Sequence, residues 1–238
     1  EGAPFMGSYQ SLIGLYVVVF LLLQLVDLPK PTANEQQPRT RPFWEITRQT
    51  TWKISLLSAA LGYATMALIM TATPLSMQAH HHSFSASAFV IQWHVIAMFM
   101  PSFFTGNLIQ RFGSKNTMLV GIGLNLLCIL INTQGQFFLS YWSALILLGV
   151  GWNFMFIAGT TLLTETYRPE EKALVQGVND VLVVGAAASG SLLAGVLQNQ
   201  IGWETLNMVV APPLLLLAGW LLWLCLLYTS PSPRDSIA

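Results

Sequence analysis

Long apolar runs recur through this chain and constrain its fold more than any other feature. We find seven of them, at residues 10–28, 53–77, 85–110, 117–132, 137–164, 173–198 and 205–227. All but the fourth are long enough to cross a bilayer as helices, for which roughly 20 apolar residues suffice. No run alternates apolar and polar residues with the period of a strand, so a membrane barrel is not indicated. The pattern predicts an all-α membrane protein with seven transmembrane helices.

The composition agrees with a membrane protein and excludes other classes. Hydrophobic residues make up 54% of the chain and charged residues 8%, whereas about 25% of residues are charged in a soluble domain. The formal net charge is zero, which gives no reason to expect a nucleic-acid partner. Cys128 and Cys225 both fall inside apolar runs, so no disulfide framework is predicted. The lipid bilayer is the expected environment of most of the chain.

The Lys and Arg residues gather in alternate connections between the runs. The first connection with its flank holds Lys30, Arg39, Arg41, Arg48 and Lys53, the third holds Arg111 and Lys115, and the fifth holds Arg168 and Lys172. The second, fourth and sixth connections hold none. Because short loops rich in Lys and Arg stay on the cytoplasmic side, this alternation predicts a multi-pass protein of the cell membrane. The N-terminal end of the chain is then outside and the C-terminal end is in the cytoplasm.

The spacing of the runs predicts a chain that belongs to a larger molecule. The first run, within residues 1–28, is separated from the others by a long polar connection at residues 29–52. The other six follow one another through short connections over residues 53–227. The sequence then changes to "YTSPSPRDSIA", residues 228–238, which we expect to be a non-native tail. One helix followed by six is the arrangement expected if an N-terminal half is missing.

Two stretches of the six-helix part resemble each other. "SFFTGNLIQRFG", residues 102–113, aligns with "SLLAGVLQNQIG", residues 191–202. The alignment pairs Ser102 with Ser191, Gly106 with Gly195, Leu108 with Leu197 and Gly113 with Gly202. The first copy ends on the predicted cytoplasmic side and the second on the outer side. Residues 53–227 are therefore expected to form a 3+3 inverted repeat, an architecture that recurs in transporters.

The stretch "GNLIQRFGSK" resembles the cytoplasmic signature of the major facilitator superfamily, Gly-x-Leu-x-Asp-Arg-x-Gly-Arg-Lys. The matching residues are Gly106, Leu108, Arg111, Gly113 and Lys115. Gln110 stands at the Asp position and Ser114 at the first basic position after the glycine. Both departures favour the second copy of the signature, which lies in the C-terminal half of such proteins. "YRPEEKALVQGVND", residues 167–180, is similar to the other cytoplasmic loop of that half.

The resemblance implies a fold and a function. Residues 53–227 would form the C-terminal half of a transporter that moves a small solute by alternating access, with the missing N-terminal half as partner and no cofactor or metal. Whether a proton is coupled to transport stays open. Asn179 and Asp180 would join the signature residues at a cytoplasmic gate. Gly106 would allow helices to approach closely, although ordinary packing explains it equally well, and Gly113 would adopt a positive φ at a helix end.

Several polar or aromatic residues at membrane depth are candidates for the solute cavity, because such groups are costly in lipid. They are Tyr63 and Thr65 in the second run, Gln92 and His94 in the third, and Trp152 and Asn153 in the fifth. Gln92 and His94 point about 200° apart on a helix, so they need not share a cavity. His94 could either line the cavity or bond to a neighbouring helix. The resemblance assigns the second, third, fifth and sixth runs to the cavity.

Other classes fit the sequence less well. A seven-helix receptor would leave the long basic connection and the inverted repeat without a role. A retinal protein would need a Lys in the seventh run, which has none. An intramembrane serine protease would need Gly-x-Ser-Gly where the chain has "AASG". His80, His81 and His82 are expected to form a polar outer loop rather than a metal site, because adjacent residues rarely converge on one ion.

Overall fold

The computed structural model describes residues 6–26 and 41–229. Part of the long connection, residues 29–40, and most of the expected tail, residues 230–238, lie outside these ranges. The chain divides into two units, Glu1–Arg39 and Thr40–Ala238, which we describe separately. In the first unit, helix α1 covers Met6–Leu23 and is apolar along its length. The end of the first predicted run, residues 27–28, is outside the described residues.

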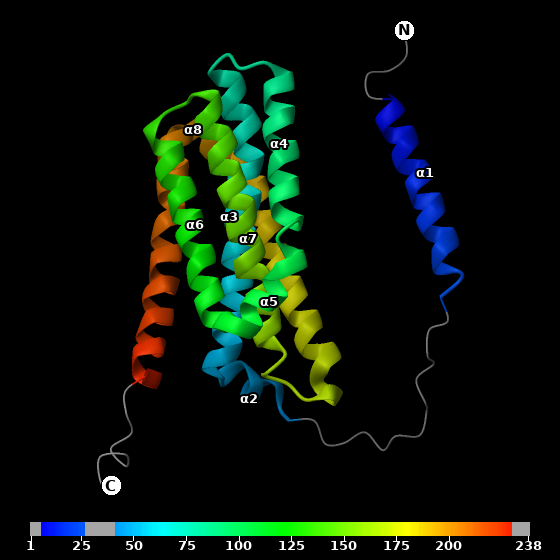
Figure 1. The fold of residues 1–238 in the computed structure, drawn as a ribbon, viewed down its shortest axis with the longest axis vertical. Coiled ribbons are helices and arrows are strands. Elements are labelled where there is room, and N and C mark those ends of the chain that lie inside the picture. Colours follow the sequence, from blue (N-terminus) through cyan, green and yellow to red (C-terminus); the bar gives the residue numbers. More distant parts are fainter. Residues whose placement is uncertain (1–5, 27–40, 230–238) are drawn as a thin grey trace. The chain divides into compact units, whose positions relative to one another are not determined.

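The second unit is a bundle of helices and contains no strand among the residues described (Figure 1). This confirms the all-α prediction. The helices are α2 (Phe43–Arg48), α3 (Thr50–Ala79), α4 (Phe84–Phe99), α5 (Ser102–Phe112), α6 (Ser114–Gln134), α7 (Phe138–Leu163) and α8 (Lys172–Thr229), with the 3-10 helix η1 (Pro169–Glu171) before α8. In the described chain, four helices are long and apolar enough to cross a membrane, or five if the bent pair α4–α5 counts as one span.

The third predicted run is broken rather than continuous. Helices α4 and α5 meet at Met100 and Pro101 with a bend of 43°. Proline has no backbone N–H and clashes with the preceding turn, so it ends α4 and begins α5. Asn153 of α7 holds the break: its Nδ2 donates to the Met98 carbonyl oxygen and to Ser102 Oγ, both at 2.7 Å. The third predicted run, residues 85–110, is therefore a bent pair of helices that together are long and apolar enough for one span.

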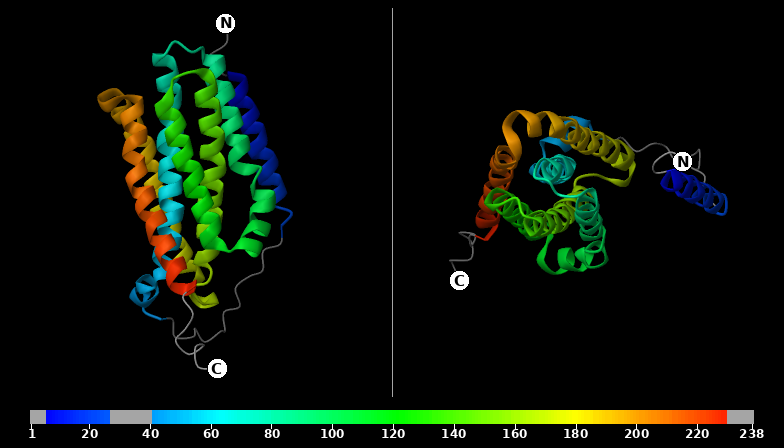
Figure 2. Two further views of the ribbon diagram at one scale, coloured as in Figure 1. Left: turned by 60° about the vertical axis from the view of Figure 1, so that its left-hand side comes forward. Right: turned by 90° about the horizontal axis from the view of Figure 1, so that it is seen from above.

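Helix α8 is two helices that meet at Gly202. A continuous helix of its 58 residues would be about 87 Å long, far more than a bilayer crossing requires. Gly202 has φ 75° and ψ 173°, which breaks the helix, and the two limbs run in opposite directions from this turn in Figures 1 and 2. Gly113, between α5 and α6, has nearly the same angles, φ 82° and ψ 156°. The prediction of a positive φ at Gly113 is confirmed.

Close helix contacts occur at glycines other than those expected. A Cβ atom added at Gly121 of α6 would lie 2.8 Å from the Gly151 carbonyl oxygen of α7, and one at Gly151 would lie 2.9 Å from the Gly121 carbonyl oxygen. Gly190 of α8 approaches the Ala64 carbonyl oxygen of α3 even more closely, at 2.6 Å. Gly106 has no atom within 4 Å of such a Cβ. The close-approach role expected for Gly106 is therefore not present among the described helices.

The connections gather at two ends of the bundle. Figure 2 shows the α3–α4 and α6–α7 connections at the same end as the break in α8. The connections that contain Gly113 and Arg168 lie at the opposite end, together with α2. Arg48, Arg111, Lys115 and Lys172 also belong to elements or connections of that end. The Lys and Arg residues in the described part of this unit are therefore concentrated at one end of the bundle.

Candidate functional site

A cavity of about 610 Å³ opens between α3 and α4, at the end where these two helices connect. It is lined by Pro74, Leu75 and Gln78 of α3, His82 of the connection, and Phe84, Ser87, Ala88, Ile91 and Gln92 of α4. Its volume lies in the range of small-molecule pockets, about 300–1,000 Å³. The lining combines apolar side chains with a few polar groups, which is typical of sites that bind organic solutes.

Gln92 is the polar group deepest along α4 in this lining. It stands in the middle of the apolar sequence "FVIQWHVIAMF" and its side chain is exposed. No described residue forms a hydrogen bond with its carboxamide. A carboxamide with no partner is costly in hydrocarbon. The exposed surface around Gln92 is therefore suited to water or a polar solute rather than to lipid tails.

An aromatic cluster lies farther along the same helix faces. Tyr63 of α3 contacts Trp152 and Phe156 of α7 edge to face, with ring centroids 5.3 and 5.6 Å apart. Trp152 stacks on Phe156 at 5.2 Å and meets Phe99 of α4 at 6.1 Å. Trp152 is buried, but Phe99 is 58% exposed and Tyr63 is half-buried. The cluster therefore keeps ring surface that no described residue covers.

The structure separates the remaining cavity candidates from this surface. His94 is fully buried, and its Nδ1 lies 2.7 Å from the Leu145 carbonyl oxygen of α7, which matches the helix-bonding alternative. Asn153 is fully buried too, and Thr105 Oγ1 lies 2.7 Å from its Oδ1, so both ends of its amide are engaged at the α4–α5 break. Thr65 is 3% exposed. Gln92 and His94 thus lie on different faces of α4, as their spacing indicates.

The three consecutive histidines lie at the α3–α4 connection and make separate contacts. His80 Nδ1 is 2.8 Å from the Ser76 carbonyl oxygen, and His82 Nε2 is 2.9 Å from the Gln136 carbonyl oxygen. His81 has a positive φ of 62° in the turn. Among the described residues, no group of three or more His, Cys, Asp or Glu side chains could hold a metal ion. The histidines instead fix the connection to neighbouring backbone.

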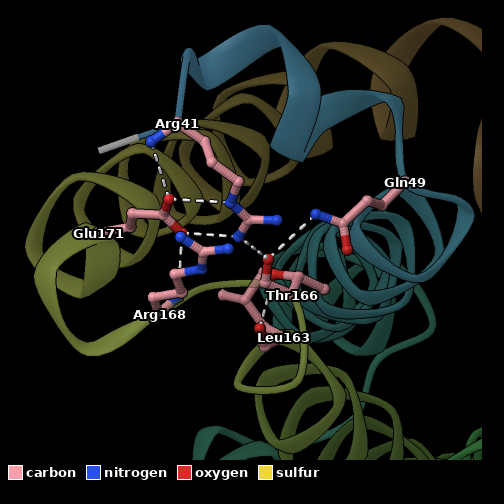
Figure 3. A network of polar contacts seen from close by, with 6 residues as sticks. All are labelled: Arg41, Gln49, Leu163, Thr166, Arg168 and Glu171. Atoms are coloured by element: carbon pink, nitrogen blue, oxygen red, sulfur yellow. Dashed lines mark hydrogen bonds and ion pairs between the residues drawn. The ribbon is translucent and has the colours of Figure 1, made fainter. Parts of the chain in front are cut away.

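An ion pair that the sequence did not reveal lies at the opposite end of the bundle (Figure 3). Arg41 donates from Nε to Glu171 Oε1 at 2.9 Å and from Nη2 to Glu171 Oε2 at 2.7 Å. The backbone N–H groups of Arg41 and Arg168 also donate to this carboxylate. Arg41 Nη2 and Gln49 Nε2 both donate to the Thr166 carbonyl oxygen. We call the contacts of Arg41, Gln49, Thr166 and Glu171 the basal latch.

Apolar contacts support the basal latch. Ile46 of α2 is 1% exposed and clusters with Trp52, Leu163 and Val175, which come from three further helices. The Arg41 side chain, followed by the Arg168 backbone N–H, lowers the pKa of the Glu171 carboxyl to about 2. Glu171 lies in the polar connection between α7 and α8, and it is charged at neutral pH. The described end of the long connection, residues 41–52, is thereby fastened to the bundle by charge and by apolar packing.

Comparisons with known proteins decide the family. A family model described as Major Facilitator Superfamily matches the chain twice, at residues 7–187 and at residues 55–238. The chain belongs to the Major Facilitator Superfamily. It is 39% identical over 212 residues to the riboflavin transporter RfnT of Brucella anthropi, covering 88% of this chain and 53% of that protein. It is 31% identical to the uncharacterized MFS-type transporter YdeG of Bacillus subtilis, covering 92% and 53% of the two chains.

The superfamily also includes more distant relatives of this chain. The tetracenomycin C resistance and export protein of Streptomyces glaucescens is 26% identical over 167 residues, covering 66% of this chain and 30% of that protein. The chain spans about half the length of the first two curated relatives it matches. Family membership makes it a multi-pass membrane protein.

The residues that match the superfamily's cytoplasmic signature lie around the α5–α6 turn. Arg111 is exposed at the end of α5, with its guanidinium 5.3 Å from the Phe112 ring centroid. Leu108 and Lys115 are half-buried on either side of Gly113. Asn179 is 2% exposed on α8, and Asp180 beside it is exposed. No contact given by the structure joins Asn179 or Asp180 to the α5–α6 turn, so a shared gate remains an expectation.

Proposed function

We propose that this chain is the C-terminal half of a transporter that moves a small organic solute across the cell membrane by alternating access. The observation that carries the proposal is the α3–α4 cavity, where Gln92 presents, from the middle of an apolar helix, a carboxamide to which no described residue bonds. A polar group in that position marks a solute pathway more often than a lipid contact. Because superfamily members are transporters rather than enzymes, the serine-protease alternative is not proposed, and neither is a receptor.

We also propose the 3+3 inverted repeat over residues 53–227. Gly113 and Gly202, which the sequence alignment pairs, share nearly the same backbone angles. Ser102 and Ser191 are paired as well, and each bonds to the helix that the repeat requires. Ser102 accepts a hydrogen bond from Asn153 of α7, and Ser191 Oγ lies 3.2 Å from Thr71 Oγ1 of α3. In an inverted repeat α3 and α7 are equivalent helices, so the two contacts correspond.

The proposed membrane topology has seven spans, with α1 as the last helix of the preceding half. Two limbs of α8, the bent pair α4–α5, and α3, α6 and α7 supply the other six. The end of the bundle that carries the basal latch, Arg111 and Lys115 would face the cytoplasm. The histidine connection and Gly202 would face outside, with the N-terminal end of the chain outside and its C-terminal end inside.

The N-terminal half of the complete transporter would cover the exposed faces of α5 and the first limb of α8. Gly106 on α5 and Gly185 on α8 have no atom within 4 Å of an added Cβ, and Gly195 has only one, at 4.0 Å. Val181, Leu192 and Val196 are exposed beside them. Apolar helix faces with small residues are suited to close helix packing. We therefore propose that Gly106 allows close helix packing at the interface between the two halves, rather than within this half.

A planar aromatic compound is the solute class that we favour. Tyr63 and Phe99 leave ring surface uncovered near the cavity, and aromatic rings pair with planar ligands through stacked or edge-to-face contacts. The relative RfnT is named for riboflavin, which contains such a ring system. Asp180 is the only acidic residue in the described parts of the proposed spans that approaches the membrane interior from the cytoplasmic end. Whether transport is coupled to a proton therefore depends on residues of the complete protein.

Uptake by purified protein tests this proposal. We expect the complete transporter that contains this chain, reconstituted in liposomes, to take up riboflavin with saturation, and residues 1–225 alone to take up none. The isolated chain lacks the second half of the solute pathway. Saturable uptake by residues 1–225 alone would contradict the proposal, as would the absence of any uptake of riboflavin and related planar compounds by the complete protein.

A further inference from the structure

Two glutamine carboxamides, one from each helix, line the α3–α4 cavity. Gln78 and Gln92 both line it, from α3 and α4 respectively, and no described residue bonds to either carboxamide. A carboxamide offers an N–H donor and a C=O acceptor side by side. Such a group forms two parallel hydrogen bonds with a ring edge that carries an adjacent acceptor and donor, as Gln does with adenine.

The position of Gln92 relative to the aromatic cluster sets the size of the ligand. Phe99 follows Gln92 by seven residues in the same unbroken helix, so the two side chains share a face about 10 Å apart along the axis. Tyr63 precedes Pro74 by three helical turns on α3, so it shares the face of α3 that lines the cavity. A fused ring system of two or three rings spans the distance between Gln92 and Phe99.

Exposure of the aromatic cluster favours a stacked ligand. Phe99 is 58% exposed although it lies next to the buried Trp152. The hydroxyl of Tyr63 forms no hydrogen bond with any described residue, and its ring is only half-buried. Stacking on such rings tolerates different ring systems, whereas the carboxamide is selective for the hydrogen-bonding edge.

We propose that Gln92 recognises the amide or imide edge of a planar heteroaromatic solute, whose rings stack on Phe99 and Tyr63. The inference rests on the proposed function and adds the chemical feature by which the solute is selected. Gln92 determines which ring edge is accepted, and Phe99 contributes affinity without that selectivity.

A binding experiment separates the two roles. The complete transporter in lipid nanodiscs is titrated with lumichrome, a three-ring compound with an imide edge, and with its N,N-dimethyl derivative, in which both ring N–H groups are blocked. We expect the parent protein to bind lumichrome about tenfold more tightly than the derivative. Gln92→Met keeps the length of the side chain but not its amide, so it should reduce this ratio to near one.

Two further variants complete the experiment. Phe99→Leu should weaken binding of both compounds by about tenfold and keep the ratio between them. Gln134→Leu, which changes a glutamine outside the α3–α4 cavity, should change neither affinity. The inference is overturned if Gln92→Met, folded as judged by its melting temperature, keeps the parent ratio, or if the parent binds neither compound. Riboflavin uptake is measured in parallel: uptake without dependence on Gln92 refutes only the inference, and selective binding without uptake refutes only the proposed transport.

Discussion

Gly151→Ala is expected to destabilise the helical bundle, although it adds only a methyl group. That methyl would lie 2.9 Å from the Gly121 carbonyl oxygen and from Asn125, so α6 and α7 would have to separate. Overpacking of this kind costs about 1–3 kcal/mol. One of the three closest atoms is a backbone oxygen that cannot rotate away, and the other two belong to the buried side chain of Asn125. We expect a lower thermal unfolding temperature and less folded protein after purification.

Gly123→Ala is the matched control for this substitution. Gly123 is on α6 as well, but an added Cβ there meets no atom within 4 Å. Alanine has a higher helix propensity than glycine by about 1 kcal/mol, so this variant should be as stable as the parent or slightly more stable. Equal unfolding temperatures for Gly151→Ala and Gly123→Ala would show that the α6–α7 crossing is looser than described.

Glu171→Ala should open the basal latch and release α2 from the bundle. The substitution removes the carboxylate that accepts from the Arg41 side chain and from two backbone N–H groups. Among the described residues, the guanidinium then keeps only the Thr166 carbonyl oxygen as an acceptor. Removing one partner of a largely buried pair is much more disruptive than removing an exposed charge. We expect trypsin to cleave after Arg48 at a rate at least about tenfold higher.

Glu170→Ala provides the comparison for the latch experiment. Glu170 is the neighbouring residue, carries the same charge and is exposed, and it forms no ion pair with any residue that the structure describes. Its replacement should leave cleavage after Arg48 near the parent rate. If Glu170→Ala and Glu171→Ala accelerate cleavage equally, the effect comes from net charge in this connection and not from the pair with Arg41.

The pH dependence of the latch follows from the same carboxylate. Its contacts lower the pKa of Glu171 from 4.5 to about 2. Because the folded pKa is the lower one, the ion pair stabilises the folded state above the ordinary pKa, and this contribution is lost as the pH falls toward the folded value. The latch is therefore fully formed at neutral pH, and a change within the physiological range does not open it.

Much of the helical pattern was predictable from the sequence, because apolar runs of membrane length have few alternative structures. The positive φ at Gly113 was predictable too, since a glycine followed directly by a second helix favours such a turn. Pro101 is the sequence signal for the break in the third run, because proline cannot continue the helix before it. The break in α8 at Gly202 agrees with the two runs expected there.

Contacts between distant residues were not predictable in the same way. Arg41 and Glu171 are 130 residues apart, and only the folded bundle brings them together. Asn153 and His94 each look like cavity residues in the sequence, because a polar residue in an apolar run has the same appearance whether it faces solute or a neighbouring carbonyl oxygen. The tight glycines, Gly121, Gly151 and Gly190, differ from the open Gly106 only in the helix face they occupy, which depends on how the helices are rotated.

Accessibility of residue 92 to water tests the central claim most directly. In the complete transporter with Cys128 and Cys225 replaced by alanine, Gln92→Cys is compared with Leu127→Cys, which is exposed on α6 seven residues before that helix ends at Gln134. If the α3–α4 cavity is a solute pathway, a membrane-impermeant maleimide added from outside labels residue 92, riboflavin slows that labelling, and residue 127 stays unlabelled in lipid. Failure to label residue 92, or equal labelling of both residues, would contradict the account.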